Sequence, residues 1–399
     1  MSSNAKQAAV MIRANLFSLP RRHSISVSMV ISVALVVCVL AGFLAMARGF
    51  ETALQSAGSN SVAVILGGGT NQEAGSDVPA SVIRTLSAMT DDLGVTQDAN
   101  GMPIVSREIV VAVDANSSET DTRRTIALRG MDPSGPSIRD NITLSAGRML
   151  APGTREIVVG HRLAQQFGFS IGSVVRLGTV DWTVVGLFSA QGSAFESEIW
   201  ADLDAVRAAF DRQGQVQSLR MRLASAASLP RLQEKLGTIK TTPLRAVAEA
   251  ELYAAQSGRT ASLIRLFGWP LALLMAVGAT AGALNTMMNS VSDRTVEIAT
   301  VRALGFSRIS AFLGTWVEAV VLAAIGVAVG LLASWLAFNG WQASTMGANG
   351  ARMAFQLSVT GEVMATAGLL GLAIGILGGA LPAIAASRLP LTAALRSSG

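Results

Sequence analysis

Four long apolar runs dominate the hydrophobic pattern of the chain. Arg265 and Glu362 lie near the ends of two runs, and Glu318 is the charged residue inside a third. Each run exceeds the ~20 residues that a helix needs to cross the ~30 Å hydrocarbon core of a bilayer. The first is also longer than the apolar stretch of ~7–15 residues in a signal peptide, so we expect it to persist in the mature protein. The pattern predicts four transmembrane helices, at residues 24–47, 263–291, 311–338 and 362–387.

A different pattern fills residues 48–260, between the first and second runs. Short β-branched stretches alternate with short amphipathic ones, and turn-forming residues separate them. Strands are expected at 61–66, 104–113, 125–129, 156–159, 174–177, 182–187 and 218–223, and helices at 79–89, 161–167, 203–210 and 229–236. The segment therefore predicts an α+β domain. After Thr242 and Pro243 a further helix is expected, from about Leu244 into the second run, as part of a stalk.

Charge placement predicts how the chain lies in the membrane. The 399 residues are 50% hydrophobic and 14% charged, with mean hydropathy +0.47, whereas soluble domains carry about 25% charge. Residues 48–260 hold 20 Lys and Arg against 22 Asp and Glu, a net of −2, so the remainder is 11 − 4 = +7. That excess flanks the runs at residues 1–23, 292–310 and 388–399. By the positive-inside rule these segments and both termini face the cytoplasm, while 48–260 and the short loop 339–361 lie outside.

Several chemistries are excluded by the residues present. One Cys and two His provide no disulfide framework and no zinc ligand set. None of the three Lys follows Gly and precedes Ser or Thr, so no Walker A motif exists and the chain is not expected to be an ATPase. No basic cluster suits nucleic acid. The paired acids Asp91–Asp92 and Glu196/Glu198 are expected to be solvated. We therefore expect no enzyme activity, no metal and no cofactor bound by this chain.

Small residues at helical spacing predict close helix packing in the last three runs. GxxxG pairs let helix backbones approach closely in lipid, either within one bundle or between two copies. The glycines concerned are Gly278, Gly282, Gly326, Gly330, Gly371, Gly375 and Gly379. The first run has only Gly42 and is expected at the periphery. Asn285 and Asn289 share a helix face and are expected to form interhelical hydrogen bonds, and Glu318 is expected to pair with a basic residue such as Arg308 or Arg388.

The loop at residues 292–310 predicts a short amphipathic helix at the cytoplasmic surface. Ser292 or Asp293 can cap its start, and Gly305 can end it. A simple helical hairpin needs only about six connecting residues, so a capped helix here suggests a docking element.

At this point the chain resembles a known family. Asn285-Thr286, Ser290-Val291, Arg294, Glu297-Ile298 and Arg302-Ala303-Leu304-Gly305 are similar to the signature of the MacB/FtsX family of ABC-transporter permeases. The resemblance continues through Glu318 and the ending from Pro382 to Arg396. In the polar segment, residues 147–186 resemble the family's periplasmic core domain. The fold implied is an α-helical membrane protein, with four transmembrane helices and a large periplasmic α+β domain between the first two.

The resemblance implies a permease subunit of the bacterial inner membrane. Its ATP would be bound by a partner ABC ATPase, and the second permease in the dimer would be another copy or a paralogue. A periplasmic adaptor and an outer-membrane channel are further candidate partners, besides membrane lipid. Coupling to the ATPase is expected at Arg294, Glu297, Ile298, Arg302, Leu304 and Gly305, with Glu297 and Arg302 as the main charges. The chain lacks the fused ATPase of MacB and is closer to the stand-alone LolC/LolE type.

Three functions remain open at the level of sequence. The first is export or extraction of a substrate, which could be a lipoprotein, lipid, peptide or drug-like molecule. The second is FtsX-like mechanotransmission that activates a periplasmic cell-wall hydrolase. The third is a membrane-anchored sensor or enzyme whose active part is the polar domain; it leaves the loop helix unexplained.

Overall fold

The structure is a computed structural model that describes residues 2–19, 23–88, 94–99, 104–116, 123–239, 242–346 and 350–389. It divides into two compact units. The first, here called the helical unit, comprises residues 1–48, 262–341 and 357–399. The second, here called the α+β domain, comprises residues 49–261 together with residues 342–356.

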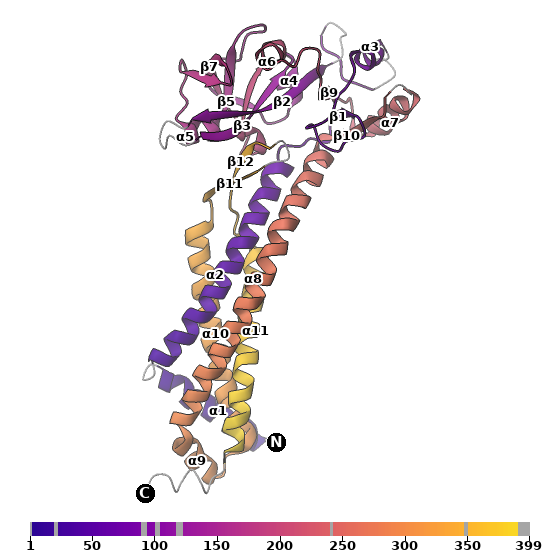
Figure 1. The fold of residues 1–399 in the computed structure, drawn as a ribbon. Coiled ribbons are helices and arrows are strands. Elements are labelled where there is room, and N and C mark those ends of the chain that lie inside the picture. Colours follow the sequence, from indigo (N-terminus) through magenta and orange to yellow (C-terminus); the bar gives the residue numbers. More distant parts are fainter. Residues whose placement is uncertain are drawn as a thin grey trace. The chain divides into compact units, whose positions relative to one another are not determined.

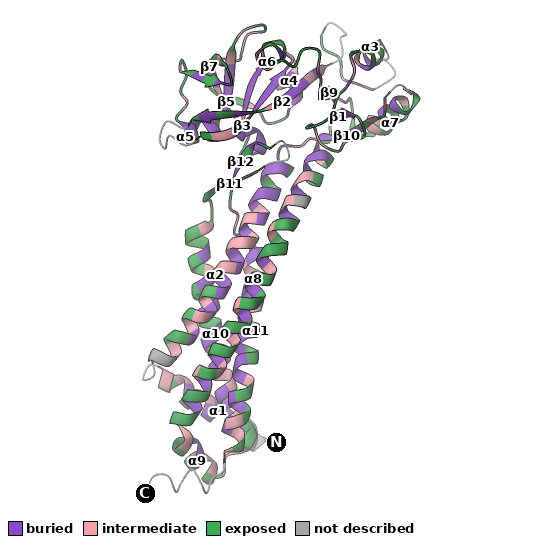
Figure 2. Cartoon of the chain, in the orientation of Figure 1, coloured by how far each residue is buried: buried purple, intermediate pink, exposed green. Residues whose placement is uncertain are grey.

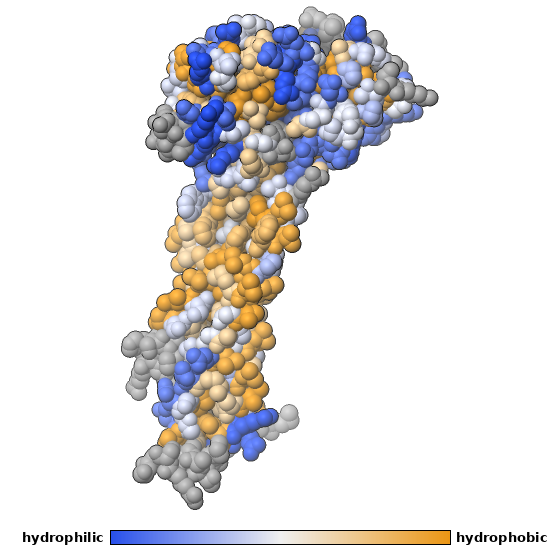
Figure 3. All heavy atoms as spheres, in the orientation of Figure 1, coloured by the Kyte–Doolittle hydropathy of each residue, from blue (hydrophilic) through white to orange (hydrophobic). Residues whose placement is uncertain are grey.

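Among its described residues, the helical unit has six helices, some of which extend beyond it along the chain (Figure 1). They are α1 (Ser2–Ser18), α2 (His23–Gln55), α8 (Glu249–Asp293), α9 (Thr295–Ala303), α10 (Arg308–Phe338) and α11 (Gly361–Arg388). Among the described residues, α8, α10, α11 and the part of α2 from Ser26 are long and apolar enough to cross a membrane, by length and composition alone. On the face that Figure 3 shows, much of the surface over these helices is hydrophobic, as the orange spheres indicate.

Glycines set how closely α2, α10 and α11 approach one another. A Cβ built on Gly326 would lie 2.8 Å from the Val30 carbonyl oxygen, and one on Gly330 would lie 2.6 Å from that of Ala34. Those carbonyls belong to α2, so the first apolar helix packs against α10. This corrects our expectation that it would lie at the periphery. The sequence signal was misleading because the glycines of this contact lie on α10, while α2 contributes Val and Ala.

The α10–α11 contact is built in the same way. A Cβ on Gly375 would overlap the Cβ of Ala323, and one on Gly379 would overlap that of Ala319. A Cβ on Gly371 would lie 2.5 Å from a Val327 methyl group. Buried side chains of α2, α8, α10 and α11 then form one continuous core. Figure 2 shows buried purple alternating with exposed green along these helices.

The α+β domain is built on one mixed sheet. Its strand order is β10-β1-β9-β2-β3-β8-β5-β7-β4, with β6 paired to β7. The pairs β3·β8 and β5·β7 are parallel, and the other pairs along this order are antiparallel. The strands are β1 (Val62–Gly67), β2 (Val105–Asn116), β3 (Arg123–Met131), β4 (Thr143–Gly147), β5 (Glu156–Gly160), β6 (Val174–Leu177), β7 (Val180–Ser189), β8 (Glu198–Asp202), β9 (Ser218–Arg222) and β10 (Leu244–Ala248).

Two hydrophobic cores support this sheet, one at each end of the strand order. One packs β2, β3, β5, β7 and β8 with α5 (His161–Phe167) and α6 (Leu203–Ala209). The other packs β1, β9 and β10 with α3 (Ala80–Ala88) and α7 (Leu229–Thr238). The short helix α4 (Gly135–Ile138) lies between β3 and β4 in the chain. The α+β class expected from the sequence is therefore the class of this domain.

Two segments differ from expectation. The helix expected from Leu244 begins only at Glu249, because residues 244–248 form β10 and pair with β1, Ala63 opposite Ala248. The loop 339–361, expected as a simple connection, contains the hairpin β11 (Gln342–Met346) and β12 (Arg352–Gln356). This hairpin packs into the α+β domain: the Ala354 amide donates to Ser197 Oγ at 3.0 Å, and Phe355 meets Phe50 edge to face with centroids 5.5 Å apart.

Candidate functional site

The predicted loop helix is α9, between α8 and α10. α8 stays helical through Asp293, and the residue before α9 is Arg294, whose side chain forms no capping bond. The cap expected from Ser292 or Asp293 is therefore absent, because the chain has not left the helical conformation there. Gly305, with φ of +98°, follows α9 in the left-handed conformation that glycine tolerates. Ser307 then caps α10, accepting from the Ser310 amide at 3.2 Å.

Arg294 joins three helices at this end of the helical unit. It donates to Glu318 of α10 at 3.1 Å, to the Asn15 side chain of α1 at 2.8 Å and to Glu297 of α9 at 3.3 Å. The Glu318 side chain is 3% exposed and that of Arg294 is 11% exposed. Glu318 thus pairs with a basic residue, as expected, but this residue is Arg294 and not one of our two examples, Arg308 and Arg388. The break between α8 and α9 turns Arg294 inward, and sequence spacing does not reveal such a turn.

Two further residues of the predicted coupling set face the chain's own helices. Ile298 is buried in a small cluster with Met11 of α1, Val291 of α8 and Ala386 of α11. Arg302 donates to the Leu389 carbonyl oxygen at 2.8 Å, just after α11. These contacts fix α9 to its neighbours.

Other side chains of α9, and the residue that follows it, are open to solvent in the isolated chain. Leu304 is 77% exposed and Val296 is 41% exposed, and the Glu297 side chain is 69% exposed. Between α9 and α1 lies a cavity of about 210 Å³, lined mainly by apolar groups, including Val10, Met11 and Phe306. Within the predicted coupling set, the side chains of Glu297 and Leu304 are therefore exposed, while Arg294, Ile298 and Arg302 contact other parts of the helical unit.

A polar and small-residue stripe on α8 is also uncovered. Gly278, Gly282, Asn285 and Asn289 follow one another at helical spacings of four, three and four residues, and all four are exposed. Apart from the neighbouring residues of α8 itself, no described atom lies within 4 Å of a Cβ built on either glycine. Unlike Gly326, Gly330, Gly371, Gly375 and Gly379, these two glycines pack against no other helix among the described residues.

Sequence reasoning missed a buried charge cluster in the α+β domain. Three guanidinium groups meet four carboxylates across β2, β3, β8, β9, the start of α8 and the segments around residues 73 and 139. The members are Arg129, Arg139, Arg220, Glu73, Glu108, Glu198 and Glu249. Glu198, expected to be solvated, bonds to Arg129 at 2.7 Å, and Glu196, likewise expected in water, pairs with buried Arg162 at 3.2 Å. Asp91–Asp92 lies outside the described residues.

Glu108 is at the centre of this cluster. It is fully buried, takes two bonds from Arg139 at 2.7 and 2.8 Å and one from Arg129 at 3.0 Å, and also contacts Arg220. Burial pushes the pKa of Glu108 upward, but the three guanidinium groups outweigh it and lower the pKa to about 2. Arg129 and Arg220 lower the pKa of Glu73 in the same way. These carboxylates stay ionised at neutral pH and are bonded to guanidinium groups. Such an arrangement suits a role in holding the strands together rather than in acid–base catalysis.

Comparisons with known proteins agree with this layout. The model of the MacB-like periplasmic core domain matches residues 26–239, and that of the FtsX-like permease C-terminal region matches residues 270–391. A macrolide export ATP-binding/permease protein MacB from Rhodopseudomonas palustris is 26% identical over 395 residues, which cover 92% of this chain and 56% of that protein. The MacB of Nitrobacter winogradskyi is 32% identical over 243 residues, covering 56% of this chain and 35% of that protein.

The chain spans about half the length of the curated relatives it matches. Among solved structures, the periplasmic region of MacB from Actinobacillus actinomycetemcomitans is similar over 50% of this chain and 93% of that one, with 12% identity and a TM-score of 0.38.

Proposed function

Because the chain belongs to the MacB/FtsX family of ABC-transporter permeases, we propose that it is the permease subunit of an ABC transporter in a bacterial inner membrane. The four apolar helices span the bilayer, and both termini and α9 lie on the cytoplasmic side. The α+β domain lies on the outer side. The positive charge around α9 and at the two ends of the chain supports this orientation.

ATP is hydrolysed by a separate ABC ATPase, and α9 is the element on which it docks. The observation that carries this proposal is the two-sided character of α9. Its inner side is fixed by Arg294, Ile298 and Arg302, while Glu297 and Leu304 stay exposed. Because α9 is held rigidly on one side, a displacement of α9 by the docked ATPase would also move α8 and α10, which flank it in the chain. Residues 1–399 contain no Gly-Lys-Ser/Thr sequence, which supports placing the nucleotide-binding site outside these residues.

A second permease, identical or paralogous, covers the stripe of Gly278, Gly282, Asn285 and Asn289. Side-chain amides facing lipid are costly, whereas small residues beside polar ones suit a helix–helix contact. In the complete transporter, ATP-driven motion is transmitted to the α+β domain, which exports or extracts a substrate. An adaptor and an outer-membrane channel are candidate partners of that domain.

The docking proposal is tested by substituting the exposed face of α9. We expect Leu304→Glu and Glu297→Lys each to reduce co-purification of the ATPase at least tenfold, and to abolish transport-coupled ATP hydrolysis. Leu144→Glu on β4, another exposed leucine, is the matched control and should leave co-purification within twofold of wild type. Retention of the ATPase by both α9 variants would show that docking occurs elsewhere.

A further inference from the structure

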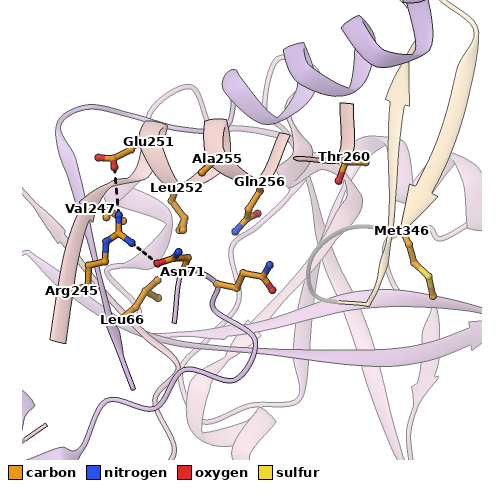
Figure 4. Close-up of a pocket in the computed structure, with 11 residues that line it drawn as sticks. Leu66, Asn71, Arg245, Val247, Glu251, Leu252, Ala255, Gln256, Thr260 and Met346 are labelled. Atoms are coloured by element: carbon orange, nitrogen blue, oxygen red, sulfur yellow. Dashed lines mark hydrogen bonds and ion pairs between the residues drawn. The ribbon is translucent and has the colours of Figure 1, made fainter. Parts of the chain in front are cut away.

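The α+β domain contains a cavity of about 200 Å³ beside the edge strand of its sheet (Figure 4). Its floor is apolar: Leu66 of β1, Val247 of β10 and Leu252 of α8 are each at most 5% exposed. These three side chains, with Val64, form a small hydrophobic cluster of their own. A cavity of ~150 Å³ with apolar walls accepts benzene in another protein, so this space has room for a ring or short alkyl chain.

Among its described lining residues, the rim of the cavity is polar and has one positive and one negative side chain, Arg245 and Glu251. Arg245 reaches Glu251 at 3.8 Å and also donates to the Asn71 side chain, as the dashed lines in Figure 4 show. Because the guanidinium and the carboxylate offset each other, the described side chains of the rim offer hydrogen bonds without a net charge. Gln256 and Thr260 add an amide and a hydroxyl group. A charged ligand would have to break the Arg245–Glu251 pair, whereas an uncharged hydrogen-bonding group would not.

One face of α8 forms a wall of this cavity. Leu252, Gln256 and Thr260 follow at four-residue spacing and therefore lie on the same side of the helix. Gln256 and Thr260 also line a second cavity, which reaches Arg129 and Glu198 of the buried charge cluster. A bound molecule would therefore contact α8 between its first residue, the buried Glu249, and the apolar part of the helix that follows.

We propose that this cavity binds an uncharged amphiphile, with an alkyl or aromatic group on Leu66, Val247 and Leu252 and a hydrogen-bonding head at Asn71, Gln256 and Thr260. The binding site follows from the cavity alone. Its role as the recognition site for the transported substrate rests on the permease function proposed above.

The chain offers a matched pair of variants for the test. Ala255 is exposed and lines the cavity, so Ala255→Trp fills the space without disturbing a core. Ala254 is its exposed neighbour on α8 and does not line the cavity, so Ala254→Trp adds the same side chain elsewhere. The probes are 4-butylphenol, which is uncharged at neutral pH, 4-butylbenzoate and 4-butylbenzylammonium. Binding is measured by calorimetry on the full chain in lipid nanodiscs, after subtraction of empty nanodiscs.

We expect saturable binding of 4-butylphenol that weakens at least tenfold in Ala255→Trp and stays within twofold in Ala254→Trp. Both charged probes should bind at least fivefold more weakly. No saturable binding, equal loss in the two variants, or preference for a charged probe would each overturn the proposal. Modulation of ATP hydrolysis by 4-butylphenol is measured separately with the ATPase present. If binding follows the expected pattern but hydrolysis does not respond, the site stands and the proposed transport role fails.

Discussion

Replacing Glu108 by Gln tests whether the buried charge cluster holds the α+β domain together. Glu108 is 0% exposed and accepts both bonds by which Arg139 is held to a carboxylate. Without its charge, Arg139 keeps the Gly135 carbonyl oxygen and the faces of Phe195 and Trp200 as neighbours. A buried guanidinium group would then lack its counter-ion.

The expected cost can be worked out in two ways. Removing one partner of a buried ion pair typically destabilises a protein by about 3–5 kcal/mol. The lowered pKa of Glu108, about 2 against an ordinary value of 4.5, is of the same order, because a shift of this size corresponds to about 3 kcal/mol at 1.36 kcal/mol per pKa unit. Both routes predict a loss near 3 kcal/mol, which is a large part of the stability of a typical domain.

Hydrogen exchange of the full chain in nanodiscs measures this loss locally. Peptides covering β2, β3 and β9 should exchange about 100-fold faster in Glu108→Gln than in wild type, the equivalent of about 3 kcal/mol. The control is Glu234→Gln on the exposed side of α7, for which we expect a change within about 0.5 kcal/mol. A difference below 1 kcal/mol between the two variants would refute the idea that the cluster holds the α+β domain together.

The same cluster predicts how stability depends on pH. Because the folded pKa of Glu108 lies below its ordinary value, its contribution is complete above pH 4.5 and is lost as the pH falls towards about 2. The lowered pKa of Glu73 acts in the same direction. Glu108→Gln should therefore unfold with a weaker dependence on pH between 4.5 and 2 than wild type, when both are followed by tryptophan fluorescence. An unchanged slope would contradict the assignment.

Three more predictions concern the helical unit. Gly375→Val should separate α10 from α11, because its Cβ overlaps that of Ala323, and should lower the thermal unfolding temperature in detergent. A Cβ on Gly282 meets no described atom outside its own helix within 4 Å, so Gly282→Val should leave that temperature nearly unchanged while weakening the permease dimer proposed above, as measured by cross-linking. Arg294→Ala and Glu318→Gln should show a coupling energy of about 1–3 kcal/mol in a double-mutant cycle of thermal stability, because the groups they remove lie 3.1 Å apart in a nearly water-free site. Strictly additive effects would show that this pair does not join the helices.

Patterns that repeat locally could be predicted from the sequence. Long apolar runs specify four helices of the helical unit, and the spacing of polar and apolar residues around Glu297 indicates α9. The α+β class follows from short β-branched stretches between turn residues. Residues 244–248 were assigned wrongly because five residues of mixed character suit a helix or a strand equally well, and pairing with β1 decides between them.

Charges that meet across the fold could not be predicted in this way. Glu73 and Arg220 lie 147 residues apart in the chain, and each looks like an ordinary surface residue in its own segment. The sequence held only a weak sign of the buried cluster. Glu108 and Arg129 each lie beside apolar residues in a strand, and a charge buried there needs a partner of opposite charge. Arg294 and Glu318 are only 24 residues apart, yet the choice of partner depends on how α8 breaks at Asp293.

The hairpin β11–β12 also bears on how the chain is made. It belongs to the α+β domain, yet it follows α10 in the sequence, so that domain lacks one of its parts after β10 has been synthesised. At typical rates the ribosome needs roughly 5–20 s more to reach Gln356. During that interval the contacts of Ser197 with the Ala354 backbone and of Phe50 with the Phe355 ring have not yet formed. The domain is therefore completed late in translation, and a chain truncated after α8 would leave these surfaces open to chaperones and proteases.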